Sequence, residues 1–259
     1  MPSELVLCSI KDGVGVVTLH NPPLNLVTLE LTRQLKQSVL RLAADPAVRV
    51  IILTGAGERA FCAGSDIKEF PEVMSAVVPK KLRAENEAYS LVDDFPKPTI
   101  AALNGLALGG GLELAVCCDL IIAEAGNVVG LPEIKLGVFP GSGGTIRVTR
   151  RIGEGRAKEM MYFGDPVPVE TALGWGLVNR VVGRGESLPV ATALARTLAL
   201  RPGFALQMCK CSIDMAVDMA EHDAVEASLA LSERVFSSAD CKEGVRAFFA
   251  KEHPQFVHR

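Results

Sequence analysis

The chain has 259 residues, of which 49% are hydrophobic and 22% charged, and its net charge is −3. This length and apolar content suit a large α/β unit with a sizeable core. The small negative charge and the lack of any run of about 20 apolar residues exclude a general attraction to nucleic acid and a membrane span, so we expect neither partner.

The seven cysteines and four histidines form no pattern typical of a metal site. Cys117-Cys118 and Cys209-x-Cys211 lack the two-pair spacing of zinc ligands, and no two histidines stand four residues apart. We therefore expect buried, reduced thiols and no metal. Reduced thiols, together with an N-terminus (Met1–Leu5) that has no basic or apolar leader, predict a cytoplasmic protein.

The first half of the chain alternates strand patterns with helical patterns. Strands are predicted at residues 14–20, 48–54, 99–103 and 119–123. The runs at 48–54 and 99–103 are continuously apolar, as in strands buried on both faces. Helices are predicted over 28–43 and 80–94 and from Gly110 onward.

After Gly141 the pattern becomes mainly helical. The predicted helices cover 145–152, 156–163, 170–175, 188–200, 204–217, 222–236 and 242–251, with one short strand at 178–182. Repeated strand and helix units followed by helices predict an α/β fold with a helical C-terminal part.

A glycine run stands before the first of two glutamates that could carry acid–base chemistry. In Gly109-Gly110-Gly111-Leu112-Glu113, residues without Cβ let a carbonyl group approach the main chain closely. If a helix begins there, its free N–H groups and positive dipole end favour an anion. The alternative is a tight strand-to-helix turn in which Glu113 only caps the helix.

The second glutamate, Glu133, lies twenty residues further on, after Gly130-Leu131-Pro132. By itself it could be an ordinary exposed loop residue. As a pair beside free backbone N–H groups, the two carboxyl groups could move protons next to a polarised carbonyl. The helix dipole would lower the pKa of Glu113, whereas burial would raise it.

A third glycine-bearing segment, Ala63-Gly64-Ser65-Asp66-Ile67-Lys68, follows the strand predicted at 48–54 and a turn. Its backbone can offer another N–H donor, and Asp66 can cap a short helix that follows. A nucleophilic Ser65 is disfavoured, because no histidine occupies a plausible partner position.

These segments and several others occur in a characteristic order along nearly the whole chain. They are Asn21–Asn25, Phe61–Lys68, Asn104–Leu114, Cys118-Asp119, Leu131–Gly137, Pro140–Thr145 and Ala172–Val182. In this order they resemble the enoyl-CoA hydratase/isomerase (crotonase) superfamily.

That resemblance implies a crotonase-type spiral of ββα units with a helical C-terminal region, assembled as a homotrimer or a dimer of trimers. We accordingly predict a core over 1–200, which contains the CoA and catalytic sites, and a trimerisation region over 201–259. The substrate would be an acyl-CoA thioester. Coenzyme A would enter as part of the substrate, with no separate cofactor.

By the same resemblance, Glu113 and Glu133 match the two catalytic glutamates of hydratases, whereas isomerases commonly lack the first. We predict that Glu113 is the base that activates water and that Glu133 is the acid that protonates Cα. The backbone N–H groups of Ser65 and Gly110 match the oxyanion hole. The predicted CoA and substrate contacts are Ala63, Gly64, Asp66, Ile67, Lys68, Gly109 and Leu24.

One position departs from the pattern of the family. Leu24 stands where many hydratases have a basic residue that can meet a CoA phosphate. The phosphate contacts could instead come from Arg59, Lys68 or a neighbouring subunit's Lys251.

Several alternatives remain open. The chain could be a specialised hydratase, such as a crotonobetainyl-CoA hydratase, or an enoyl-CoA isomerase. It could also be a non-catalytic RNA-binding homologue that uses Lys80, Lys81 and Arg83, although nearby acidic residues make a solvated face the expected role of these charges. Within segment 71–95, apolar side chains could line an acyl pocket or pack as a lid. They are Met74, Val77, Val78 and Leu82.

Overall fold

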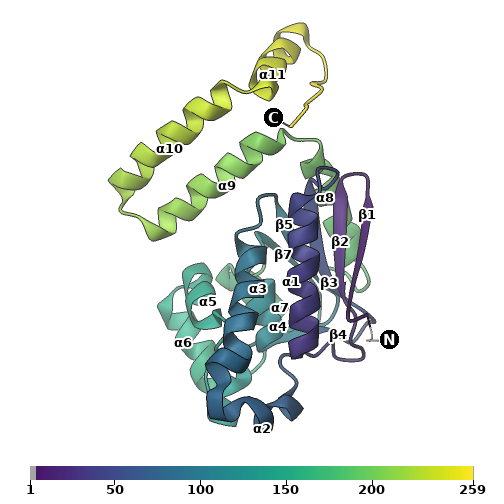
Figure 1. Cartoon of the computed structure of the whole chain (residues 1–259), viewed down its shortest axis with the longest axis vertical. Helices are drawn as coiled ribbons and strands as arrows, with labels where there is room; N and C mark the ends of the chain where they lie inside the picture. Colours follow the sequence, from purple (N-terminus) through teal and green to yellow (C-terminus); the bar gives the residue numbers. More distant parts are fainter. Residues whose placement is uncertain (1–3, 259) are drawn as a thin grey trace.

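The fold contains two β-sheets, which the computed structural model describes within residues 4–258 (Figure 1). In spatial order, the larger sheet consists of β1 (Val6–Lys11), β2 (Val14–Leu19), β3 (Val50–Gly55), β5 (Thr99–Leu103), β7 (Leu120–Glu124) and β10 (Arg180–Val182). The smaller sheet consists of β4 (Ala60–Cys62), β6 (Leu106–Leu108), β8 (Val128–Gly130) and β9 (Val167–Pro168). Only the pairs β1/β2 and β8/β9 are antiparallel within these described sheets.

Helices follow the strands and then dominate the C-terminal part. They are α1 (Leu29–Ala44), α2 (Phe70–Val73), α3 (Arg83–Asp93), α4 (Gly110–Ala115), α5 (Gly144–Ile152), α6 (Glu154–Phe163), α7 (Val169–Trp175), α8 (Ser187–Ala199), α9 (Gly203–Asp218), α10 (Glu221–Phe236) and α11 (Ala239–Ala250).

One strand from each sheet and one helix form a repeating unit. β3, β4 and α3 make one unit, and β5, β6 and α4 make the next. β7 and β8 continue the series and lead into a 3-10 helix, Pro132–Leu136. Each repeat advances the chain by one parallel strand in both sheets. This arrangement confirms the predicted spiral of ββα units.

Apolar side chains cover both faces of the larger sheet. On one face, α1 contributes Leu31 and Leu35 to the main core. On the other face, α8 packs Ala191 and Ala195 against side chains such as Ile100. The central strands β3 and β5 are therefore buried on both sides, as their continuous apolar sequences predict.

The helices α9 to α11 extend away from the sheets (Figure 1). α9 packs against α10, and α10 packs against α11. Large apolar side chains remain exposed on these helices: Ile213, Val217, Val225, Leu229, Phe236, Val245, Phe248 and Phe249. The boundary predicted at residue 200 falls between α8 and α9, and the trimerisation role of the second region stays a prediction. Residues 1–3 and 259 of the two predicted regions lie outside the described residues.

Most of the predicted elements are confirmed to within a few residues. Thr28 caps α1, since its Oγ1 accepts a hydrogen bond from the Leu31 N–H at 3.1 Å. The strand predicted over 99–103 coincides with β5. The helix predicted over 80–94 begins as a π-helical turn, Val78–Leu82, before α3. The sequence did not predict β1 or the smaller sheet, whose two- and three-residue strands are too short to show alternation.

Two predictions from the sequence concern the state of the cysteines and the absence of a membrane span. All seven cysteines are free thiols, and Cys62, Cys117 and Cys118 are buried. Cys209 is exposed, so the prediction of buried thiols is wrong at that position. Across residues 4–258, none of the helices combines the length and apolar character needed to cross a membrane.

Candidate active site

Glu113 lies in α4, and its side chain is held by the beginning of another helix. The residue is 3% exposed. Its Oε1 accepts hydrogen bonds from the backbone N–H groups of Ser142, at 2.8 Å, and Gly144, at 2.9 Å. Gly144 is the first residue of α5. The sequence places Glu113 in the first turn of its own helix, but its hydrogen bonds come from the start of α5, where N–H groups have no intrahelical acceptor.

The surroundings of Glu113 oppose its ionisation. The pKa of Glu113 is raised from its ordinary value of 4.5 to about 7, chiefly by burial and also by the charge of Glu133, while the hydrogen bonds from Gly144 and Ser142 offset part of the shift. Of the two opposing effects expected from the sequence, burial is therefore the stronger. A carboxyl group with this pKa can accept or release a proton near neutral pH.

Glu133 lies in the 3-10 helix Pro132–Leu136 and directs a carboxyl oxygen into the interior. Its Oε2 is buried and has no hydrogen-bond partner among residues 4–258. Burial raises the pKa of Glu133 to about 7. Glu133 is therefore not an ordinary exposed loop glutamate. A buried polar atom without a protein partner needs an explanation, and a substrate or water that supplies the partner is one.

Gly109 brings the glycine run next to Glu133. Its φ of +52° and ψ of −131° are rarely accessible to residues with a Cβ. A Cβ at this position would also lie 3.1 Å from Glu133 Oε1. The glycine thus allows the chain to turn from β6 into α4 while Glu133 approaches the main chain. Through this contact the segments 109–113 and 130–133 share one site.

The segment that contains Ser65 lies against the same glycine run. A Cβ on Gly64 would stand 3.6 Å from Gly110 N, and one on Gly110 would stand 3.8 Å from Ser65 N. Among the described residues, the backbone N–H groups of Ser65 and Gly110 donate no hydrogen bond. The structure therefore brings the two predicted oxyanion donors together, and both are free of internal partners.

The remaining predicted contacts lie on the segment that contains Ser65 or beside it. Ala63 N donates to Leu24 O at 2.9 Å, which places Leu24 beside the segment. Asp66 caps the 3-10 helix Ile67–Glu69 as predicted, and its Oδ1 accepts from Lys68 N at 3.0 Å. Ile67 and Lys68 are exposed.

The basic residues considered for phosphate binding are available at the surface. Arg59 and Lys68 are exposed, and so is Lys251, which follows α11. No contact in the structure assigns any of them to a phosphate, so their role stays a prediction.

Two charged residues of the helix predicted at 80–94 are buried. Lys81 and Glu85 were expected on a solvated face, but each is 1% exposed, and that prediction is wrong. The reason is that Glu69 and Ser142, which are distant in sequence, cover and pair with them. The loss of Lys81 from the surface leaves only Lys80 and Arg83 of the basic cluster that the RNA-binding hypothesis requires.

The sequence also gave no role to Tyr89, Ser142 or Gly144. The Tyr89 hydroxyl donates to Gly110 O at 3.0 Å, next to a predicted oxyanion donor. One sequence signal could have identified part of this set: Lys81, Glu85 and Tyr89 recur every four residues, which places them on one helix face. The backbone donors of Ser142 and Gly144 carry no comparable side-chain signal.

Known proteins are similar to this chain in both sequence and fold. A family model described as enoyl-CoA hydratase/isomerase matches residues 9–259. The chain is 34% identical to crotonyl-CoA hydratase of Syntrophomonas wolfei over an alignment of 263 positions, which covers 100% of both chains. It is 34% identical to short-chain-enoyl-CoA hydratase of Clostridium acetobutylicum, with 93% of each chain covered.

A solved structure shows that the similarity extends to the three-dimensional fold. The enoyl-CoA hydratase of Bacillus anthracis superposes with a TM-score of 0.95 and 33% identity, covering 99% of this chain and 100% of that one. Similarity of this extent in sequence and in fold leaves no large segment unmatched. The chain belongs to the enoyl-CoA hydratase/isomerase family.

Proposed function

We propose that this chain is an enoyl-CoA hydratase, which adds water reversibly to a 2-enoyl-CoA thioester and forms a 3-hydroxyacyl-CoA. The observation that carries the proposal is that the buried Glu113 and Glu133, whose Oε2 is buried, belong to the same site as two free backbone N–H groups and have pKa values raised to about 7. Hydration needs one group to take a proton from water and another to give a proton to carbon, and this pair can do both near neutral pH.

In the proposed reaction, Glu113 takes a proton from water as the oxygen forms a bond to C3. The electron pair of the double bond moves to C2 and the thioester carbonyl, and Glu133 delivers a proton to C2. The hydrogen bonds of the two residues favour this division. Backbone donors to Glu113 Oε1 favour the ionised form, while Glu133 Oε2 has no donor among residues 4–258 to stabilise a charge.

The backbone N–H groups of Ser65 and Gly110 would stabilise the negative charge that develops on the thioester oxygen. Removing one donor of this kind typically costs about 2.7–4 kcal/mol of transition-state stabilisation. A pair of such donors therefore accounts for a large part of a catalytic rate enhancement. The reaction is redox-neutral and consumes only water, so CoA is needed only as part of the substrate.

Three further features support the rest of the proposal. Met74, Val77 and Val78 are exposed apolar side chains near the segment 65–69, which suits an apolar acyl chain.

The exposed apolar side chains of α9 to α11 suit assembly into a trimer or a dimer of trimers, because a large apolar patch usually marks an interface. Sedimentation at micromolar concentration would distinguish these assemblies from a monomer. The free thiols suit the reducing cytoplasm.

The activity is tested with crotonyl-CoA and with enoyl-CoA thioesters of longer chains. We expect the enoyl absorbance to fall and the product to gain the mass of one water molecule. A protein that is inert with every chain length would overturn the proposal. Conversion of a 3-enoyl-CoA to a 2-enoyl-CoA at unchanged mass, without hydration, would instead identify an isomerase.

Gly144→Ala tests the position of the Glu113 carboxylate. A Cβ at residue 144 would lie 2.7 Å from Glu113 Cγ and 2.9 Å from Oε1, so it must displace the carboxylate from its two donors. We expect kcat to fall by about 100-fold, since a displacement of 1 Å can reduce catalysis by that factor. The matched control is Gly155→Ala, where a Cβ meets no atom within 4 Å. A kcat of Gly144→Ala similar to that of the control would contradict the assigned position.

A further inference from the structure

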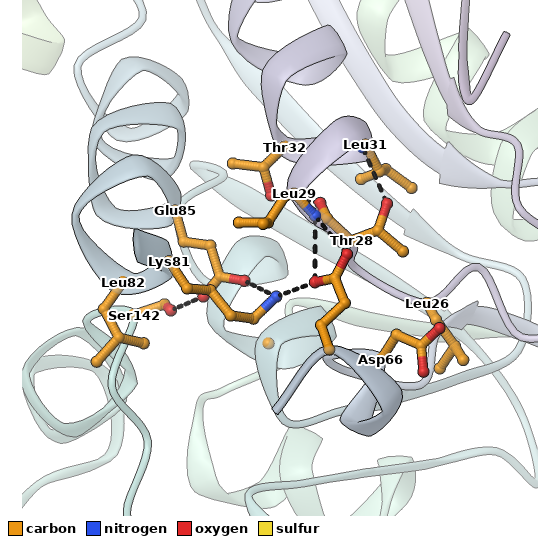
Figure 2. A network of polar contacts seen from close by, with 12 residues as sticks. Leu26, Thr28, Leu29, Leu31, Thr32, Asp66, Lys81, Leu82, Glu85 and Ser142 are labelled. Atoms are coloured by element: carbon orange, nitrogen blue, oxygen red, sulfur yellow. Dashed lines mark hydrogen bonds and ion pairs between the residues drawn. The ribbon is translucent and has the colours of Figure 1, made fainter. Parts of the chain in front are cut away.

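Lys81 is a fully buried cation at the centre of an ionic cluster that the reaction chemistry does not use directly. Its Nζ lies 2.9 Å from Glu69 Oε2 and 3.1 Å from Glu85 Oε1 (Figure 2). Burial lowers the pKa of Lys81, but the two carboxylates outweigh it and the net shift is upward, so the ammonium stays charged. The contact with Glu85 Oε1 is an ion pair and not an aligned hydrogen bond. Buried ion pairs contribute little net stability, so stability alone does not explain this cluster.

One arm of the cluster leads to Glu113. Glu85 Oε2 accepts a hydrogen bond of 2.6 Å from Ser142 Oγ, and both residues are buried. The backbone N–H of the same Ser142 donates to Glu113 Oε1. Fixing the Ser142 side chain therefore fixes the direction of an N–H group that holds the proposed base. A single residue separates the ionic cluster from this carboxylate.

The other arm leads to the segment that contains Ser65. Glu69 accepts hydrogen bonds from Leu29 N at 3.1 and 3.3 Å, at the start of α1. Figure 2 shows Lys81 between Glu85 and this end of α1, with Asp66 on the adjoining segment. Glu69 is the last residue of the 3-10 helix that Asp66 caps, and Ser65 immediately precedes the cap. The Lys81–Glu69 contact thus ties the Ser65 segment to the helical region at 78–93.

We propose that Lys81 is a positioning residue that sets the separation between the proton-transfer group Glu113 and the oxyanion donor Ser65. One arm holds Glu113 through Glu85 and Ser142, and the other holds the Ser65 segment through Glu69. The inference rests on the proposed hydration reaction, in which Glu113 and Ser65 act on one thioester. Lys81 itself contacts neither the substrate nor the reacting atoms in the proposed reaction.

The test compares Lys81→Met, Lys81→Arg and Ser142→Ala with the wild type, each measured well below its unfolding transition and normalised to folded protein. We expect Lys81→Met to lower kcat by about 100-fold while KM changes by less than about threefold, because misplacement affects the transition state more than CoA binding. Lys81→Arg keeps a cation that can pair with both carboxylates, and it should recover at least a tenth of the wild-type kcat.

Ser142→Ala removes only the link between Glu85 and Ser142 and leaves the Lys81 pairs intact, so it keeps the test decisive if Lys81→Met does not fold. We expect it to lower kcat by about tenfold, as loss of a hydrogen bond to a charged group would. The matched control is Lys36→Met, which breaks the exposed Lys36–Glu87 pair between α1 and α3 and should keep wild-type kcat.

Two results would overturn the inference: a kcat of Ser142→Ala within twofold of wild type, or a loss in Lys81→Met that Lys81→Arg does not recover. A purely structural role predicts a lower melting temperature with unchanged kcat per folded molecule. The activity of the wild-type protein distinguishes failure of the positioning role from failure of the proposed function. If wild type hydrates crotonyl-CoA and the variants behave like Lys36→Met, only the positioning role is wrong.

Discussion

Glu113→Gln and Glu133→Gln should each lower kcat for crotonyl-CoA hydration by about 10²- to 10⁴-fold, the usual contribution of a general acid or base. Glutamine keeps the shape of the side chain, and at residue 113 its Oε1 can still accept from Ser142 and Gly144. It cannot accept or deliver a proton at neutral pH. KM should stay within about threefold, because neither carboxyl group is assigned to CoA binding.

The control for these variants is a buried glutamate away from the site. Glu124 lies in β7, and its Oε1 accepts from Ser187 Oγ at 2.7 Å on the side of α8. Glu124→Gln should therefore retain turnover. The double variant Glu113→Gln/Glu133→Gln should lose little more than the more damaging single variant, since residues that act as a unit are not additive. Unchanged kcat in either single variant would remove that residue from the mechanism, and full additivity would show that the two act independently.

The sequence predicted the strands and helices in which burial produces a long pattern of apolar residues. β5 coincides with its prediction because every residue of Thr99–Leu103 is buried, and α1 begins where Thr28 can cap it. β4 and β6, of three residues each, were not predictable, because their pairing depends on each other and not on a local pattern. The spiral that brings both glutamates together came from resemblance to a family, and its geometry became visible only in the structure.

The parts of the site that depend on side-chain type were predictable from the sequence, and the hydrogen-bond donors that the backbone supplies were not. The carboxyl groups of Glu113 and Glu133 are recognisable from residue type. The N–H groups of Ser142 and Gly144 are not, since every residue except proline has one. Lys81 resembled a surface lysine because the groups that bury its charge are remote or uninformative locally: Glu69 is twelve residues away, and Ser142 lies 57 residues from Glu85.

Glu133→Gln should also stabilise the fold at alkaline pH while it abolishes turnover. The folded-state pKa of Glu133 is about 7, against an ordinary value of 4.5. A raised pKa means that the folded state binds the proton more tightly than the unfolded state. The stability from this group is therefore fully present below about pH 4.5 and is lost as the pH rises through 7. Glutamine keeps the neutral form at every pH, so its advantage over glutamate should grow in that window.

We expect the free energy of unfolding of Glu133→Gln to exceed that of wild type by on the order of 2–3 kcal/mol at about pH 8, and by much less at about pH 5. Denaturant titrations at one fixed protein concentration would measure the difference, because self-association makes stability depend on concentration. Glu30→Gln is a control in which the pKa of the glutamate is shifted in the opposite direction. Hydrogen bonds from Arg33 and Gln34 lower the pKa of Glu30 to about 2, so its contribution stays constant between pH 5 and 8.

A gain in Glu133→Gln that did not change between these pH values would show that the Glu133 carboxyl is not held in the environment that gives it a pKa near 7. The acid assigned to this residue would then lose its physical basis, even if turnover fell. A gain that grows with pH, together with lost turnover, would show that the burial that makes Glu133 a usable acid also destabilises the folded chain. That cost would arise at the Oε2 atom, which has no hydrogen-bond partner in the described part of the chain.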